Sequence, residues 1–190
     1  MKRGKKIIAI ISLIPLILVI GLFSYVKFGG YLVMDKTIKE EFFTDIKNSP
    51  QLPERFYQIY EAMYPNSLNS SFERHLLFHK IDSKDGKSCA CTEAVYEGVY
   101  PLYVKATEII PIINIVESNF TQRKCLDYYI DKRIKENKID VENLYSLSDE
   151  EIILLLLQIE NPSYYNKKRN PDRVQARINE ISNILNNNLN

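Results

Sequence analysis

The fold of this chain is decided by the stretch Leu147-Ser148-Asp149-Glu150-Glu151-Ile152-Ile153-Leu154-Leu155-Leu156-Leu157, which runs on to Glu160-Asn161-Pro162-Ser163-Tyr164-Tyr165-Asn166. Ser148, followed three residues later by Glu151, predicts a capping box, and Leu147 is placed to staple back onto Ile152. The apolar run fills every face of a helix, which indicates deep burial. Pro162 cannot continue that helix. Other helices must therefore pack around it.

The segments on either side of this stretch also have helical periodicity. Leu102–Asn119 predicts a helix that is kinked or bulged at Pro111, and Thr121 is placed to cap a helix from Gln122 to about Asn137. Apolar residues at helical spacing predict one helix ended by Pro65 and another after Pro171. These residues are Phe56, Ile59, Tyr60 and Met63 in the first, and Val174, Ile178, Ile181 and Leu185 in the second. A short helix is expected from Ser71 to Ile81. No segment alternates like a strand, so the predicted fold class is mainly α.

The N-terminus has the pattern of a membrane anchor. Four basic residues within positions 2–6 precede Ile7–Val26, which carries no charge. About 20 such residues form a helix of roughly 30 Å, the thickness of the hydrocarbon core of a bilayer. The basic residues should stay cytoplasmic. The alternative is a long cleaved signal peptide, but no small-x-small cleavage site follows.

The composition excludes one class of partner and leaves the cysteine chemistry open. With 25 Lys and Arg against 24 Asp and Glu, the chain has no overall field that would favour nucleic acid. Cys125 could form a disulfide with Cys89 or Cys91, or all three thiols could be reduced. A third possibility is a zinc site, made by Cys89 and Cys91 with His75 and His79.

Several of these pieces resemble, in order, the peptidoglycan glycosyltransferase domain of family 51, the lipid II polymerases. That family has a Leu-Ser/Thr-x-x-Glu helix, then Pro-Ser-x-Tyr-Asn-Pro and an Asn-Pro-x-x-Ala-x-x-Arg helix. The chain matches these without a gap at Leu147, Glu151, Pro162, Ser163, Tyr165, Asn166, Asn170, Pro171 and Arg177, whereas Lys167 replaces the second proline. Upstream, Phe120–Tyr129 is similar to a Phe-Ser-Lys-Glu-Glu-Ile-Leu-Glu-Leu-Tyr segment, and Lys105-Ala106-Thr107-Glu108 looks like Arg-Lys-x-x-Glu without its arginine.

The front half departs from the family pattern. Glu61 takes the place of the glutamate in Glu-Asp-x-x-Phe, but Ala62 replaces the aspartate and no His-x-Gly follows. Of the motif Gly-Gly-Ser-Thr-Ile-Thr-Gln-Gln, only Gly86 and Ser88 remain. The resemblance implies a lysozyme-like family 51 fold over residues 49–190, after a cytoplasmic segment (1–6), a transmembrane anchor (7–28) and a juxtamembrane linker (29–48).

The resemblance also implies a site. Glu61 would be the catalytic base, with Glu54 as a competitor for that role, and Glu108 would orient the diphosphate of the substrate or hold a divalent cation. The substrate-binding residues would be Lys105, Gly86, Ser88 and Glu117. No cofactor is required, although Mg²⁺ or Mn²⁺ could assist at the diphosphate. Lys105 and Glu108, three residues apart, are predicted to share a helix face, as a clamp on the diphosphate requires.

The function that follows is polymerisation of lipid II into β-1,4 glycan strands at the outer side of the bacterial inner membrane. The partners would be lipid II, the glycan chain and penicillin-binding transpeptidases that cross-link the strands. The alternative is a catalytically degenerate relative that serves peptidoglycan biosynthesis as a binding or scaffold protein. A zinc-dependent envelope hydrolase is the third class.

Overall fold

The fold consists of helices joined by turns and loops. The computed structural model describes residues 2–71, 89–100, 102–137, 139 and 143–187, with the backbone alone for 2–13 and 106. Within these ranges it is mainly α, with nine α-helices, two short 3₁₀ helices and no strand. The predicted fold class is confirmed at that level. The expected helix from Ser71 to Ile81 lies almost wholly outside the described residues.

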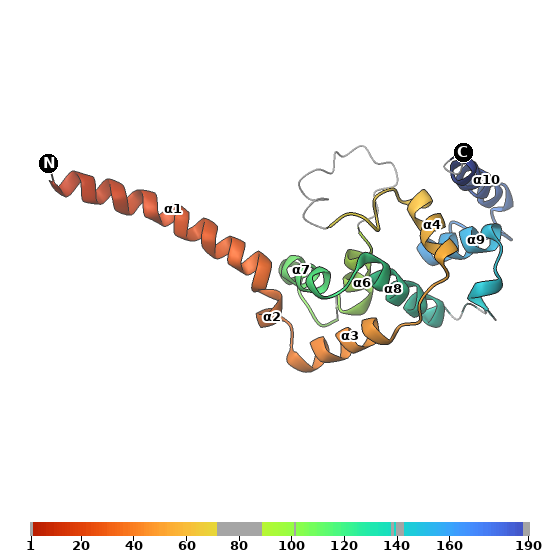
Figure 1. Ribbon diagram of the computed structural model, residues 1–190, viewed down its shortest axis with the longest axis horizontal. Coiled ribbons are helices and arrows are strands. Elements are labelled where there is room, and N and C mark those ends of the chain that lie inside the picture. Colours follow the sequence, from red (N-terminus) through yellow and green to blue (C-terminus); the bar gives the residue numbers. More distant parts are fainter. Residues whose placement is uncertain (1, 72–88, 101, 138, 140–142, 188–190) are drawn as a thin grey trace.

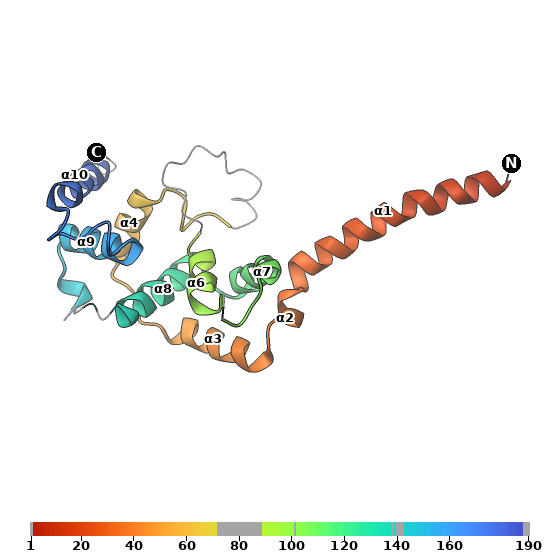
Figure 2. The same cartoon turned by 180° about the vertical axis from the view of Figure 1, so that it is seen from behind.

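Helix α1 (Lys2–Phe28) projects from the body as a long arm (Figures 1 and 2). From residue 14 onward its large apolar side chains are mostly exposed, Leu18 by 67% and Phe23 by 61%. In the part of the chain whose side chains are described, which begins within α1 at residue 14, no helix is long and apolar enough to cross a membrane.

The arm meets the body at a close contact between helices. Helix α2 (Gly30–Val33) lies against α7 (Ile109–Asn119), and a Cβ at Gly30 would stand 2.3 Å from the Pro111 carbonyl oxygen. A glycine is therefore needed at this position. Tyr25 Oη donates to the Thr107 carbonyl at 3.5 Å, and Asn119 Nδ2 donates to Tyr31 Oη at 3.2 Å.

Helix α3 (Lys36–Asn48) joins the arm to the rest of the body. The Asp35 side chain caps it by accepting from two backbone N–H groups. Phe42 is buried and lies edge-on to Tyr128, with ring centroids 5.4 Å apart. Much of the segment predicted as a juxtamembrane linker (29–48) is thus helix α3, which packs on α8 (Gln122–Glu136).

Helix α8 occupies the centre of the body. It packs against α3, against α6 (Ala90–Gly98) and against α9 (Asp149–Glu160). Thr121 Oγ1 accepts from the Lys124 N–H, which confirms the predicted cap. A disulfide between Cys91 and Cys125 ties the first turn of α6 to the first turn of α8, whereas Cys89 is a buried free thiol.

The C-terminal helices follow the sequence-based prediction closely. Ser148 and Glu151 form the capping box of α9, with the Ser148 N–H 2.8 Å from Glu151 Oε2. Helix α9 ends at Glu160, before Pro162, and six of its apolar side chains are buried. Helix α10 (Pro171–Asn187) buries the four predicted residues, Val174, Ile178, Ile181 and Leu185. Helix α4 (Glu54–Met63) packs against both α9 and α10.

One predicted helix starts later than expected. The helix predicted from Leu102 is wrong at its beginning, because Leu102–Lys105 is non-helical, a 3₁₀ turn η1 spans Ala106–Glu108, and α7 begins at Ile109. Pro111 is the third residue of α7. A helix leaves its first N–H groups without partners inside the helix, so a proline there removes nothing and no kink is needed.

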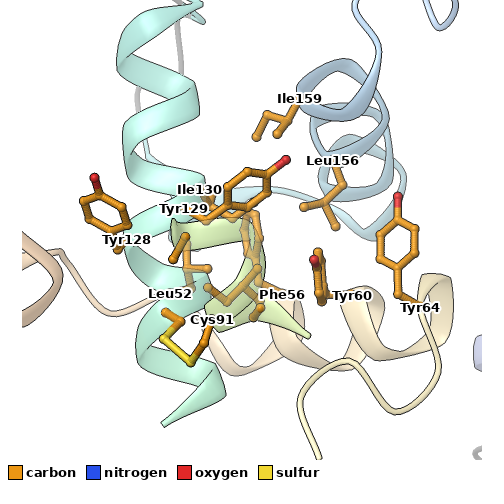
Figure 3. Close-up of a cluster of buried hydrophobic side chains, with 14 of the residues drawn as sticks. Leu52, Phe56, Tyr60, Tyr64, Cys91, Tyr128, Tyr129, Ile130, Leu156 and Ile159 are labelled. Atoms are coloured by element: carbon orange, nitrogen blue, oxygen red, sulfur yellow. A yellow bond between two sulfur atoms is a disulfide. The ribbon is translucent and has the colours of Figure 1, made fainter. Parts of the chain in front are cut away.

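Buried hydrophobic side chains, both aromatic and aliphatic, fill the space between α4, α8 and α9 (Figure 3). Tyr60 is 1% exposed, and its hydroxyl has no hydrogen-bond partner among the described residues. Its ring lies 5.0 Å from that of Tyr64, whose hydroxyl donates to Glu160. Burial raises the pKa of both tyrosines, so both stay neutral at physiological pH.

Tyr60→Phe is expected to raise the free energy of unfolding by about 1 kcal/mol. The buried Tyr60 hydroxyl loses its hydrogen bonds to water on folding and gains none from the protein. Tyr64→Phe is the matched control: it removes a hydroxyl that is hydrogen-bonded and should lower stability. Urea denaturation of the two variants measures both effects. A loss of stability in Tyr60→Phe equal to that in Tyr64→Phe would contradict the unpaired state of the Tyr60 hydroxyl.

Candidate functional site

Glu61, the predicted base, lies near the C-terminal end of α4 and holds the turn that follows. Its Oε1 accepts from the Asn66 N–H at 2.7 Å and from Asn69 Nδ2 at 3.4 Å. Its Oε2 accepts from the Leu68 N–H at 3.0 Å and from Ser67 Oγ at 3.3 Å. Asn66 adopts a left-handed backbone conformation with φ 68°, which turns these N–H groups toward the carboxylate. Both carboxylate oxygens are therefore engaged in structure.

An open cleft of about 330 Å³ lies beside Glu61. Its walls come from α4, α8, α10 and the turn after α4, and its lining residues are Arg55, Tyr57, Gln58, Glu61, Ala62, Leu68, Asn69, Arg123 and Leu185. Among the predicted site residues that the structure describes, Glu61 is the one that lines this cleft. Ala62, where the family pattern has an aspartate, contributes no second carboxylate.

The two arginines of the cleft are held by carboxylates from elsewhere in the chain. Arg55 forms a two-pronged ion pair with Asp149, and it also donates to Gln58 Oε1 at 2.7 Å. The hydrogen bonds from Arg55 lower the pKa of Asp149, so this carboxylate is ionised at neutral pH. The positive charge of the Arg55 guanidinium is therefore compensated by the negative charge of the Asp149 carboxylate.

Arg123 is held in the same way on the α8 side of the cleft. Its Nη1 and Nη2 donate to the two oxygens of Glu54 at 2.7 and 2.9 Å, and its guanidinium carbon lies 4.6 Å from the centre of the Tyr57 ring. Glu54, the competing candidate for the base, is thus an ion-pair partner. The sequence-based analysis did not single out either arginine. The two arginines come together only through the packing of α4 and α8, so no local sequence pattern identifies them.

Lys105 and Glu108 lie together, but in a different arrangement from the one predicted. The Lys105 N–H donates to Glu108 Oε2 at 2.8 Å, so the Glu108 carboxylate caps the short η1 turn. Lys105 is exposed and precedes the turn, so the predicted shared helix face is wrong. The described lining of the cleft beside Glu61 includes neither residue.

Glu117 belongs to a polar junction between helices. One of its oxygens accepts from Gln122 Nε2 at 2.8 Å and from Cys89 Sγ at 3.1 Å. Gln122 Oε1 in turn accepts from the Cys91 N–H at 2.8 Å. Burial raises the pKa of the Cys89 thiol to about 12, so it remains protonated. Gly86 and Ser88, the other predicted substrate-binding residues, lie outside the described residues.

The zinc alternative loses one of its ligands. Cys91 is bonded to Cys125, so its sulfur is not a thiolate that could bind zinc. His75 and His79 lie outside the described residues. In the ranges that the structure covers, no group of three or more His, Cys, Asp and Glu side chains is placed to hold a metal ion.

The described candidates are therefore distributed over three places: Glu61 at the cleft, Lys105 with Glu108 at η1, and Glu117 at the junction of α6, α7 and α8. The Glu61 and Glu108 carboxylates each cap their own local turn. Comparison with protein-family models, with curated proteins and with solved structures finds no match.

Proposed function

We propose that this chain is a membrane-anchored, extracytoplasmic helical protein that acts as a binding or scaffold partner in cell-wall synthesis, without turnover of its own. The finer fold assignment, a degenerate relative of the lysozyme-like family 51 glycosyltransferases, is part of the same proposal. It is supported by the motif order from Lys105 to Arg177. The observation that carries the non-catalytic assignment is the state of Glu61.

A general base needs a free oxygen within reach of the proton that it removes. Each Glu61 oxygen instead accepts hydrogen bonds from the turn at 66–69, two of them from backbone N–H groups. Releasing an oxygen would break such hydrogen bonds, and because their donors are exposed or partly buried each one is worth about 0.5–1.5 kcal/mol. Glu61 also has no second carboxylate at position 62. These features favour a structural role.

Two features support an extracytoplasmic location. Basic residues precede the uncharged part of α1, which orients such a helix with its N-terminus in the cytoplasm. The Cys91–Cys125 disulfide lies in the body that follows. Disulfides persist in oxidising compartments and are rare in the cytosol.

The catalytic alternative, a lipid II polymerase, is favoured by one observation: Glu61 shares an open cleft with Arg55 and Arg123. Guanidinium groups are well suited to a diphosphate, because their paired N–H groups match its oxygens. For this role both arginines would have to leave Asp149 and Glu54.

An assay with labelled lipid II in detergent, with Mg²⁺ or Mn²⁺ present, separates the two. The full chain is expected to form no more glycan polymer than Glu61→Gln does. In parallel, the chain should sediment with purified peptidoglycan. Polymer from the wild type alone would overturn the non-catalytic assignment, and absence from the peptidoglycan pellet would overturn the scaffold role.

A further inference from the structure

Large apolar side chains are exposed around the joint where α1 and α2 meet α7. Leu32 is 86% exposed and Leu102 83%, which is unusual for large aliphatic side chains that face water. We define six residues of this kind as the joint surface: Phe28, Tyr31, Leu32, Leu102, Tyr103 and Ile110.

These residues come from elements that are fixed to one another. Gly30 lies directly against the Pro111 carbonyl, so α2 and the first turn of α7 are in contact. Tyr25 of α1 donates to the Thr107 carbonyl in η1. Ile110 is next to Pro111, and the Tyr103 N–H donates to the Val99 carbonyl at 2.9 Å, which ties the segment before η1 to the end of α6, a helix that packs on α7. The elements that carry the joint surface are therefore held in place by contacts with one another.

The joint surface continues the exposed apolar side of α1. Ile17, Leu18, Ile20 and Phe23 of the arm are each more than half exposed, and Phe28 at its end belongs to the joint surface. Figure 1 shows the arm leaving the body at α2, with α7 beside it. A bilayer that contains the arm would reach the body at this point.

The polar groups at the joint suit the boundary between lipid and water. Tyr31 and Tyr103 have amphipathic rings of the type enriched at that boundary. Lys39 Nζ lies 5.3 Å from the centre of the Tyr31 ring, and Lys105 is exposed close to Tyr103 in sequence. Such cations are attracted to anionic head groups. A water-soluble partner protein would not require this alignment with α1.

We propose that the joint surface rests on the lipid bilayer, so that the body is held against the membrane rather than free on the end of its arm. This inference rests on the proposed anchoring of α1. Leu102 and Tyr103 enter the level of the head groups, and Lys105 faces anionic lipid.

The sequence contains no tryptophan, so a single introduced tryptophan is a clean fluorescent reporter. Three full-length variants are compared in vesicles of phosphatidylglycerol and phosphatidylcholine that carry bromine on their acyl chains. Phe23→Trp reports on the arm and Leu102→Trp on the joint surface. Ile184→Trp, on α10 at the opposite end of the molecule from α1, is the apolar control (Figure 1).

Leu102→Trp is expected to lose about half of its emission to the brominated lipid, since interfacial indoles lie at the depth of the head groups. Phe23→Trp should be quenched more strongly, and Ile184→Trp should keep its emission. Quenching at position 23 without quenching at 102 would overturn the bilayer contact and leave the anchor intact. Quenching at neither position would overturn the anchor and the contact together, and equal quenching at 102 and 184 would overturn a contact specific to the joint.

Discussion

Replacing Cys91 and Cys125 together by serine is expected to lower the free energy of unfolding by about 3–4 kcal/mol. The bridge joins residues 34 positions apart, and a cross-link of that span removes much of the conformational freedom of the unfolded chain. For a chain of this length the loss corresponds to a fall of about 10 °C in the melting temperature. Thermal and urea denaturation monitored by circular dichroism measure it.

Reduction provides the control for this prediction. Dithiothreitol should lower the melting temperature of the wild type and leave that of the double variant unchanged. Cys89 is fully buried with a raised pKa, so it should not exchange with the bridge or react with iodoacetamide until the protein unfolds. Equal stability of the oxidised and the reduced wild type would contradict the role given to the bridge.

Asp127→Ala is expected to cost about 3 kcal/mol, because it leaves two buried donors unpaired. Asp127 is 3% exposed, and its Oδ1 accepts from Tyr57 Oη at 2.6 Å and from the Leu52 N–H at 3.1 Å. These bonds attach the chain before α4 to the centre of α8. Urea denaturation at pH 7 measures the loss.

Asp127→Asn is the matched variant, because its amide oxygen can still accept both hydrogen bonds. It should stay within about 1 kcal/mol of the wild type, since it retains the acceptor and removes the buried charge. A loss in Asp127→Asn as large as in Asp127→Ala would contradict this account.

The difference in stability between the wild type and Asp127→Asn is expected to change with pH in one direction. Burial is the main cause that raises the pKa of Asp127 above its ordinary value. As pH rises, the unfolded chain releases this proton first, so the contribution of Asp127 to stability is full in acid and falls as pH passes through the folded pKa. Asp127→Asn lacks this loss. Its stability relative to the wild type should therefore increase from pH 3.5 to pH 7.

The sequence predicts those helices whose limits are set by local chemistry. The Ser148–Glu151 capping box, the Thr121 cap and the apolar spacing after Pro171 each depend on residues within one or two turns. Helix α6 was not predicted. Its buried residues, among them Ala90, Cys91, Ala94 and Val95, have helical spacing, but the segment is short and its cysteines were interpreted as possible metal ligands or bridge partners. Its stability comes from packing on α7 and α8.

The candidate site was less predictable because it depends on contacts between distant segments and on backbone conformation. Nothing in the sequence around Glu61 shows that Asn66 takes a left-handed conformation and presents the next N–H groups to the carboxylate. The start of α7 at Ile109 likewise changes Lys105 and Glu108 from a pair on one helix face to a residue and its backbone cap. The identity of these residues is visible in the sequence, but their contacts depend on the folded backbone.

The packing of α4 has a consequence for biosynthesis. Helix α4 completes its contacts only with α9 and α10: Arg55 pairs with Asp149, 94 residues later, and Tyr64 with Glu160, 96 residues later. At ribosomal speeds of about 5–20 residues per second, the apolar side of α4 stays uncovered for about 5–20 s until α9 and α10 have been synthesised. The nascent chain exposes this apolar surface during that interval, so we expect its yield to depend on the supply of chaperones.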